Sequence, residues 1–165
     1  MKYFSNLLTK WVAPVQRAIL FLLMLSVTVL VFTQVILRYV LQKPLMGIEE
    51  LLIFPAIWLY LLGGAQASLD HSHISCGILT LYIKKDRSKV IFDISKNSVS
   101  LLIAVWLCRW AYWFFAYSFK TVRTSPILSI PLILGESSIF ICLLLMIIYT
   151  VAELIEDIQK LKTIK

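Results

Sequence analysis

Four long apolar stretches, separated by short charged segments, dominate the sequence. The first runs from Ala18 to Leu37 without a charge, and a helix of this length extends ~30 Å, the thickness of the hydrocarbon core of a bilayer. Similar stretches predict further spans at about residues 48–68, 98–119 and 132–152. The pattern therefore predicts an all-α integral membrane protein with four transmembrane helices, forming a single domain over residues 1–165.

A fifth apolar stretch, Ile74 to Ile83, is too short to cross a bilayer. A cluster of basic residues follows it directly, from Lys84 to Lys89. An apolar segment with cationic neighbours is typical of a helix that lies in the headgroup region. We therefore expect an interfacial amphipathic helix at about residues 74–84, in contact with membrane lipid.

Composition supports the membrane assignment, and charge adds an orientation. The chain is 60% hydrophobic and 15% charged, far from the composition of soluble domains. Its formal net charge of +7 does not indicate nucleic-acid binding, because eleven of the Lys and Arg residues fall in the N-terminal tail, the second connection and the C-terminal tail. Only four fall on the opposite side. The positive-inside rule then predicts cytoplasmic N- and C-termini, and the N-terminal apolar run is expected to be a retained anchor.

Charges of both signs gather at the predicted non-cytoplasmic ends of the helices. The acids stand in the first turn of the second and fourth spans, where the helix dipole favours negative charge by ~0.3–1 kcal/mol at exposed sites. These residues could pair with one another, dock a soluble partner or simply be solvated helix ends. They are Arg38, Lys43, Glu49, Glu50, Lys120, Arg123 and Glu136.

Two other features of the spans predict contacts between helices. Small residues recur at a spacing of four, as Gly63 with Ala67 and Gly64 with Ser68, a pattern that allows the backbone of another helix to approach closely. Gln34 is a strongly polar residue inside the first span, and it is expected to form a hydrogen bond with a neighbouring helix rather than with a ligand.

Arg109 lies near the middle of the third span. A guanidinium at that depth costs at least ~2.5–3.5 kcal/mol on insertion scales, so it should face protein or water, or extend toward an interface. Trp106, Tyr112 and Trp113 are three or four residues away and offer aromatic rings for stacking. A substrate-binding or gating charge is the functional alternative.

The sequence offers little chemistry for catalysis. His71 and His73, with Asp70 and Cys76 nearby, make a poor metal site, and no phosphate-binding loop or nucleophile with an adjacent base is present. Neither a disulfide nor a bound cofactor is expected. Without a carboxylate inside a span or an internal repeat, a self-sufficient transporter is also disfavoured. An accessory or scaffold subunit, not an enzyme, is the favoured interpretation.

Two groups of motifs resemble those of the small membrane subunit of tripartite ATP-independent periplasmic (TRAP) transporters, the DctQ type. The first group covers the end of the first span and the whole of the second. Its elements are Arg38-Tyr39, Pro44-Leu45, Glu49-Glu50, Gly63-Gly64-Ala65 and His73-Ile74. The second group is a Ser-Pro-x-Leu-x-Ile-Pro sequence before the fourth span, from Ser125 to Pro131.

This resemblance implies a partner system in a bacterial inner membrane. A periplasmic substrate-binding protein would capture an organic acid, and a large elevator-type membrane subunit would move it inward with sodium. The small subunit would extend the static scaffold and add docking surface. Two alternatives stay open at this point: a membrane anchor subunit of a redox or lipid enzyme, and a small homo-oligomeric exporter.

Overall fold

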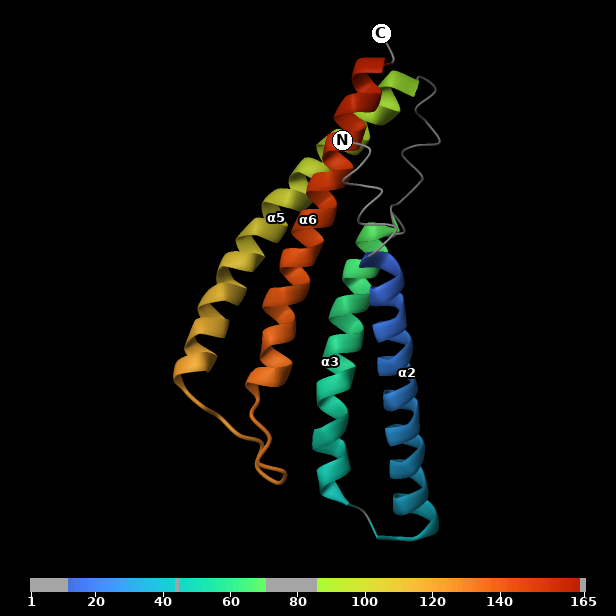
Figure 1. Cartoon of the computed structure of the whole chain (residues 1–165), viewed down its shortest axis with the longest axis vertical. Coiled ribbons are helices and arrows are strands. Elements are labelled where there is room, and N and C mark those ends of the chain that lie inside the picture. The colour runs from blue at the N-terminus through green and yellow to red at the C-terminus, as the bar shows by residue number, and fades with distance from the viewer. Residues whose placement is uncertain (1–11, 44, 71–85, 164–165) are drawn as a thin grey trace.

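The computed structural model describes residues 12–43, 45–70 and 86–163, which form four long helices (Figure 1). These are α2 (Ala13–Val35), α3 (Met46–Leu69), α5 (Asp86–Lys120) and α6 (Ile133–Thr163), with a π-helical turn η2 (Ile36–Val40) continuing α2. Each is long and apolar enough to cross a membrane. The four predicted spans are therefore confirmed as helices of a multi-pass membrane protein.

All four helices extend beyond the predicted spans, α3 by only one or two residues at each end. α2 begins at Ala13, with Pro14 in its first turn, a position where the missing N–H of proline costs no hydrogen bond. α5 and α6 contain 35 and 31 residues, so they are ~52 and ~46 Å long. Both exceed the hydrocarbon thickness because polar turns continue the apolar spans. The predicted interfacial helix at 74–84, and His71, His73 and Cys76, lie outside the described residues.

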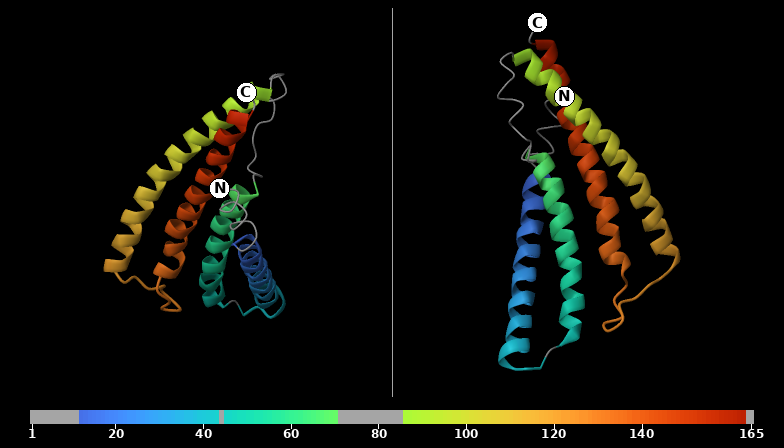
Figure 2. Two further views of the ribbon diagram at one scale, coloured as in Figure 1. Left: turned by 45° about the horizontal axis from the view of Figure 1, so that its top comes forward. Right: turned by 180° about the vertical axis from the view of Figure 1, so that it is seen from behind.

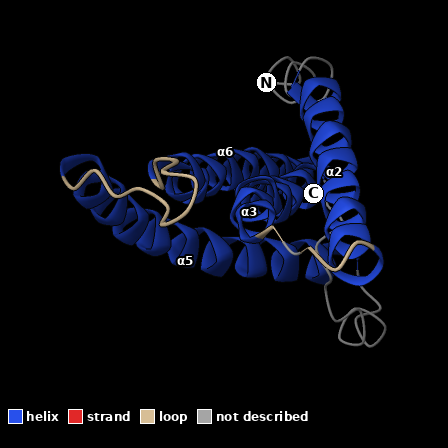
Figure 3. Cartoon of the chain, turned by 90° about the horizontal axis from the view of Figure 1, so that it is seen from below, coloured by secondary structure: helices blue, strands red, loops and turns tan. Residues whose placement is uncertain are grey.

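The helices pack in the order α2, α3, α6, α5, each mainly against its neighbours in that order. The connections between η2 and α3 and between α5 and α6 lie at one end, which we call the loop end (Figure 3). The opposite end, where α3 and α6 finish, is called the terminal end. α5 and α6 lie close together at the terminal end and spread apart toward the loop end (Figures 1 and 2).

Side-chain size accounts for this spreading of α5 from α6. At the terminal end the two helices are joined by small polar residues, with Asn97 Nδ2 donating to Asp157 Oδ2 over 3.0 Å. Nearer the loop end, aromatic rings fill the space. Phe140 of α6 contacts Tyr112 and Phe115 of α5, with ring centroids 5.9 and 5.7 Å away. The interhelical distance therefore grows as the residues between the helices become larger.

A small core and a buried polar chain hold α2, α3 and α6 together near the terminal end. Ala13, Ala65, Leu69 and Tyr149 form the apolar cluster. Beside it, the Tyr149 hydroxyl donates to Gln16 Oε1 over 2.7 Å, and Gln16 Nε2 donates to the Leu62 carbonyl over 3.2 Å. Both side chains are almost completely buried, so each hydrogen bond is shielded from water.

Charged side chains continue this network at the end of α3. Arg17 of α2 donates to Asp70 Oδ1 over 2.7 Å, and Gln66 donates to the other carboxylate oxygen over 2.9 Å. On the other side, Lys160 pairs with Asp157 at 2.9 Å. All four helices are therefore linked by polar contacts at the terminal end, whereas their outward faces are apolar and exposed, as expected for lipid contact.

We predict that Tyr149→Phe lowers the free energy of unfolding in detergent by about 0.5–1.5 kcal/mol, because it leaves the buried Gln16 oxygen without its donor. Thermal unfolding followed by circular dichroism measures the effect. Tyr60→Phe is the matched control, since Tyr60 is highly exposed on α3 and should lose no stability. Equal stability of the two variants would contradict the role assigned to the Tyr149 hydroxyl.

Candidate docking surface

Glu50 joins the start of α3 to the connection between α5 and α6. Its carboxylate accepts hydrogen bonds from the backbone N–H of Ile127 at 3.1 Å and of Leu128 at 3.0 Å, and from the hydroxyl of Ser125. A carboxylate that receives several donors is a strong acceptor. Glu50 therefore holds the connection against α3, and the two motifs recognised in the sequence meet at this contact.

The connection itself folds back into a short hairpin-like loop. An isolated antiparallel bridge pairs Thr124 with Pro131, and Ser125 N donates to the Ile130 carbonyl over 2.8 Å. Ser129 takes a left-handed conformation with φ 53°. The sequence, with prolines at 126 and 131, predicts an extended segment here. The segment is not helical, as predicted, but it is reversed rather than extended, because Glu50 accepts the N–H groups at the tip that a reversed chain leaves without partners.

Gly47 allows the hairpin to lie close to the first turn of α3. A Cβ atom at this position would stand 3.2 Å from Leu128 Cδ2, tighter than ordinary van der Waals contact. At the start of α6, a Cβ on Gly135 would be in ordinary contact with Phe54, at 3.4 Å. Trp58 adds a hydrogen bond from its indole N–H to the Leu134 carbonyl over 2.8 Å, so α3 and α6 are closely packed at the loop end.

Arg123 and Glu136 form a second link within the hairpin region. Arg123 Nη2 lies 3.0 Å from Glu136 Oε1, and the Glu136 side chain is only 17% exposed. The guanidinium also stands over the ring of Tyr117, 5.6 Å from its centroid. This pair ties the hairpin to the first turn of α6, where the helix dipole also favours the carboxylate.

Glu49 links α3 to α2 and η2. Its carboxylate accepts a hydrogen bond from Gln34 Nε2 over 2.7 Å, which confirms that Gln34 bonds a neighbouring helix. Arg38 Nη1 lies 3.9 Å from the same oxygen, and both side chains are about 60% exposed. An exposed pair at this distance contributes little, about 0–1 kcal/mol, so the Arg38 guanidinium is still available at the surface.

The remaining two cations at the loop end have no such links. Lys43 and Lys120 are exposed, and within residues 12–43, 45–70 and 86–163 neither side chain makes a hydrogen bond or an ion pair. The three acids predicted for this surface are all used by contacts inside the chain. Four cations stand against three acids at the loop end, so its net charge is positive, and Lys43 and Lys120 are the cations without an internal contact among the described residues.

The small-residue face of α3 divides into two parts. Ser68 is buried within the chain and Ala67 is half-buried, whereas a Cβ atom on Gly63 or Gly64 would have no described atom within 4 Å. The close approach expected at the glycines is therefore absent from the described part of this chain. Contact of Gly63 and Gly64 with a second protein stays a prediction.

Arg109 is exposed on α5, and the aromatic stacking expected around it is only partly seen. Trp106 and Trp113 line the same groove as Arg109, but Tyr112 lies instead against Phe140 of α6. Among the described residues the cation–π contact belongs to Arg123 and Tyr117. The position of Arg109 is considered further below.

The sequence did not reveal the polar network at the terminal end. Gln16, Tyr149, Asn97 and Asp157 were not recognised as contact residues, although each is a polar residue that falls on a buried face of its helix. A search for polar positions facing neighbouring helices, as applied to Gln34, could have found the first two.

Four apolar helices with an ordered, positively charged loop end define a multi-pass membrane protein, and no cluster of metal-ligating side chains occurs in the regions that the structure describes. The chain belongs to the DctQ family: the model for the DctQ component of tripartite ATP-independent periplasmic transporters matches residues 27–160. This is a family of transporter components rather than enzymes. No curated protein sequence matches the chain.

We predict that Glu50→Gln releases the hairpin, since the amide group has one acceptor oxygen in place of two and presents donors toward backbone N–H groups. Trypsin should cleave after Arg123 at least tenfold faster than in the wild type. This corresponds to a loss of ~1.4 kcal/mol in the free energy that keeps the hairpin closed.

Glu49→Gln is the control, because its contacts are exposed and its effect on cleavage should stay within about threefold. Cleavage rates are read by gel electrophoresis of the protein in detergent. If both variants were cleaved at the wild-type rate, Glu50 would not be what closes the hairpin.

Proposed function

We propose that the chain is the small membrane subunit that supports the large elevator-type subunit of a TRAP transporter and helps dock the periplasmic binding protein during sodium-driven uptake of an organic acid. Membership of the DctQ family supports a role as one component of a tripartite system. The distribution of Lys and Arg supports cytoplasmic termini and a periplasmic loop end in a bacterial inner membrane.

The observation that carries the docking role is the internal use of all three acids at the loop end. Glu49, Glu50 and Glu136 are held by Gln34, by the hairpin and by Arg123 respectively. The positive charge of Lys43 and Lys120 is left facing outward on an ordered base. A surface of this kind favours a partner with an acidic face, and charge complementarity speeds the encounter of soluble proteins with their targets.

The docking role predicts that Lys43→Glu combined with Lys120→Glu raises the binding-protein concentration needed for half-maximal uptake by about tenfold or more, since rim charges act chiefly on association. Uptake by proteoliposomes containing the complete membrane complex, at increasing binding-protein concentration, measures this. The wild type should also lose uptake as salt is raised, and the double variant should be less sensitive to salt.

Lys162→Glu is the matched control for these lysines, because it reverses the same charge at the terminal end. Uptake by this variant should match the wild type. If reversal at Lys43 and Lys120 had no larger effect than reversal at Lys162, positive charge at the loop end would not serve docking. Arg123 is less suitable for the test because its reversal would also break the contact with Glu136.

The scaffold role predicts that Gly64→Leu reduces co-purification with the large subunit at least tenfold while the chain alone keeps its stability. The reason is that open space surrounds Gly64 within the chain, so an added side chain obstructs only an approaching helix from a partner. Ala65→Leu is the comparison: Ala65 is 0% exposed, so overpacking should cost the isolated chain about 1–3 kcal/mol. Unchanged co-purification of Gly64→Leu would contradict packing at this face.

A further inference from the structure

Arg109 lies at the middle of the apolar part of α5 by two measures, and therefore near the middle of the bilayer that this span would cross. It stands eleven residues from both Ser98 and Lys120, the ends of the apolar part of α5, which is ~16 Å in each direction. The register of α5 against α6, fixed by the Asn97–Asp157 hydrogen bond and the Tyr112–Phe140 ring contact, places it level with Leu143–Leu145. This level is too deep for the side chain to reach lipid headgroups without deforming the membrane.

The guanidinium has no partner within the described parts of the chain. Arg109 makes no hydrogen bond, ion pair or ring contact there, and its side chain is exposed on the surface of α5. The exposed face of α2 is different: between Arg17 and Arg38 it carries only uncharged residues such as Phe21 and Phe32. α2 is thus suited to lipid over its whole length, whereas α5 is not.

This chain has no carboxylate at the level of Arg109. Its nine Asp and Glu residues all lie outside the apolar middle of the spans, and the two nearest to this level on α6, Glu136 and Glu153, are seven and eight residues from Leu143 and Leu145. A second copy packed against the same face would therefore bring no acid to mid-depth. The counter-charge has to come from a different polypeptide.

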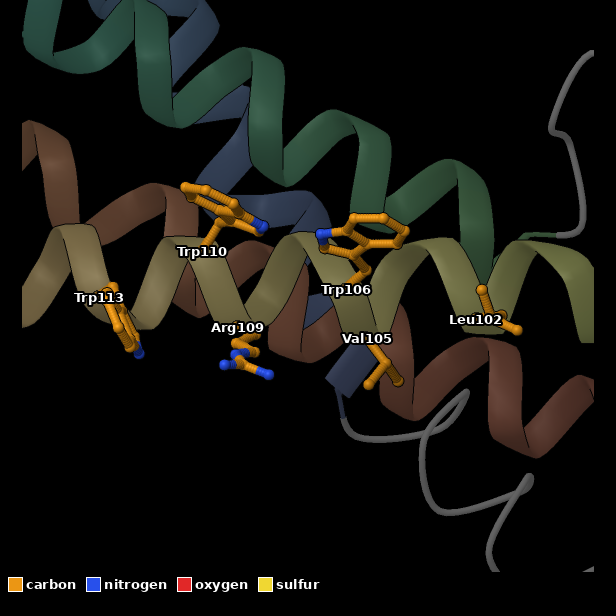
Figure 4. Close-up of a pocket in the computed structure, with 6 residues that line it drawn as sticks. All are labelled: Leu102, Val105, Trp106, Arg109, Trp110 and Trp113. Carbon is orange, nitrogen blue, oxygen red and sulfur yellow. The ribbon is translucent and has the colours of Figure 1, made fainter.

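The surroundings of Arg109 have the composition of a protein interface. A groove of about 590 Å³ runs along α5, lined by Leu102, Val105, Trp106, Arg109, Trp110 and Trp113 (Figure 4). All three tryptophans are highly exposed, and Trp106 and Trp110 lie toward the middle of the span rather than at the headgroup level that tryptophan prefers. Tryptophan and arginine are the residues most enriched where binding energy concentrates in interfaces.

We propose that this groove receives a membrane-spanning helix of another transporter component, one that carries an aspartate or glutamate near mid-membrane, and that its carboxylate pairs with Arg109. The tryptophans pack along that helix and exclude lipid from the pair. The inference rests on the proposed function, because it assigns to the groove the large membrane subunit with which the chain would assemble.

The test uses the complex of this chain with the large subunit in membranes, with the photoreactive residue p-benzoylphenylalanine at Trp106 or Trp113. The control position is Phe21 on α2, whose exposure of 67% matches the 66% of Trp113. Cross-linking to the large subunit should be at least tenfold stronger from the groove than from Phe21. The cross-linked peptide should belong to a span with an Asp or Glu near its middle.

Substitution then separates pairing from a structural role. Arg109→Leu should reduce co-purification of the large subunit at least tenfold, whereas Arg109→Lys, which keeps the charge, should stay within threefold of the wild type. Leu107→Ala, exposed on α5 outside the groove, should have no effect. The thermal stability of the isolated Arg109→Leu chain should be equal to or above that of the wild type.

The outcomes distinguish this inference from the proposed function. If the wild-type chain does not co-purify with a large subunit, both fail. If it does co-purify, but the groove cross-links only to lipid or no better than Phe21, the groove assignment alone is overturned. It is also overturned if Arg109→Leu destabilises the isolated chain as strongly as it weakens the complex.

Discussion

A membrane offers no hydrophobic drive to bring helices together, so this bundle depends on a small number of polar contacts at its two ends. Lipid tails solvate the outward faces as well as another helix would, and packing and hydrogen bonds have to supply specificity. At the terminal end, Tyr149, Gln16 and the Leu62 carbonyl join three helices, and Asn97 with Asp157 adds the fourth. At the loop end, Glu50 binds the hairpin to α3, and Glu136 binds it to α6. Between these ends the contacts are apolar.

The same residues account for the charge of the loop-end surface. A helix N-terminus attracts acids because of its dipole and its free N–H groups, which explains why Glu49, Glu50 and Glu136 occur where they do. Each acid then finds an internal donor or cation. Glu136 is paired with Arg123, whereas Glu49 and Glu50 keep their negative charge and are held by neutral donors. The lysines make no such contact among the described residues. On the proposed docking role, folding and partner recognition use different subsets of one cluster.

The sequence predicted the four membrane-spanning helices well because these spans are long and strongly apolar. Prediction of the site was less complete. The pattern located Glu50 and the Ser125–Pro131 motif but not their contact, because the two are 75 residues apart and the contact depends on tertiary packing. The shape of the hairpin was missed for the same reason. The sequence also indicates helix before Ser98, where apolar residues from Val90 onward keep a helical spacing, and a polar helical extension after Ala152; the structure confirms both, with ends at Asp86 and Thr163.

The contact between Glu50 and the hairpin also has a mechanical consequence. α5 packs mainly on α6 and diverges from it toward the loop end (Figure 2). Packing against α6 alone therefore leaves the loop end of α5 weakly held. The hairpin leaves the end of α5, is held by the first turn of α3 and then enters α6. The hairpin therefore connects α3, α5 and α6 at the loop end, and this third connection restrains sliding of α5 along α6 more than helix packing alone would. A pull on the hairpin is therefore shared by α3, α5 and α6.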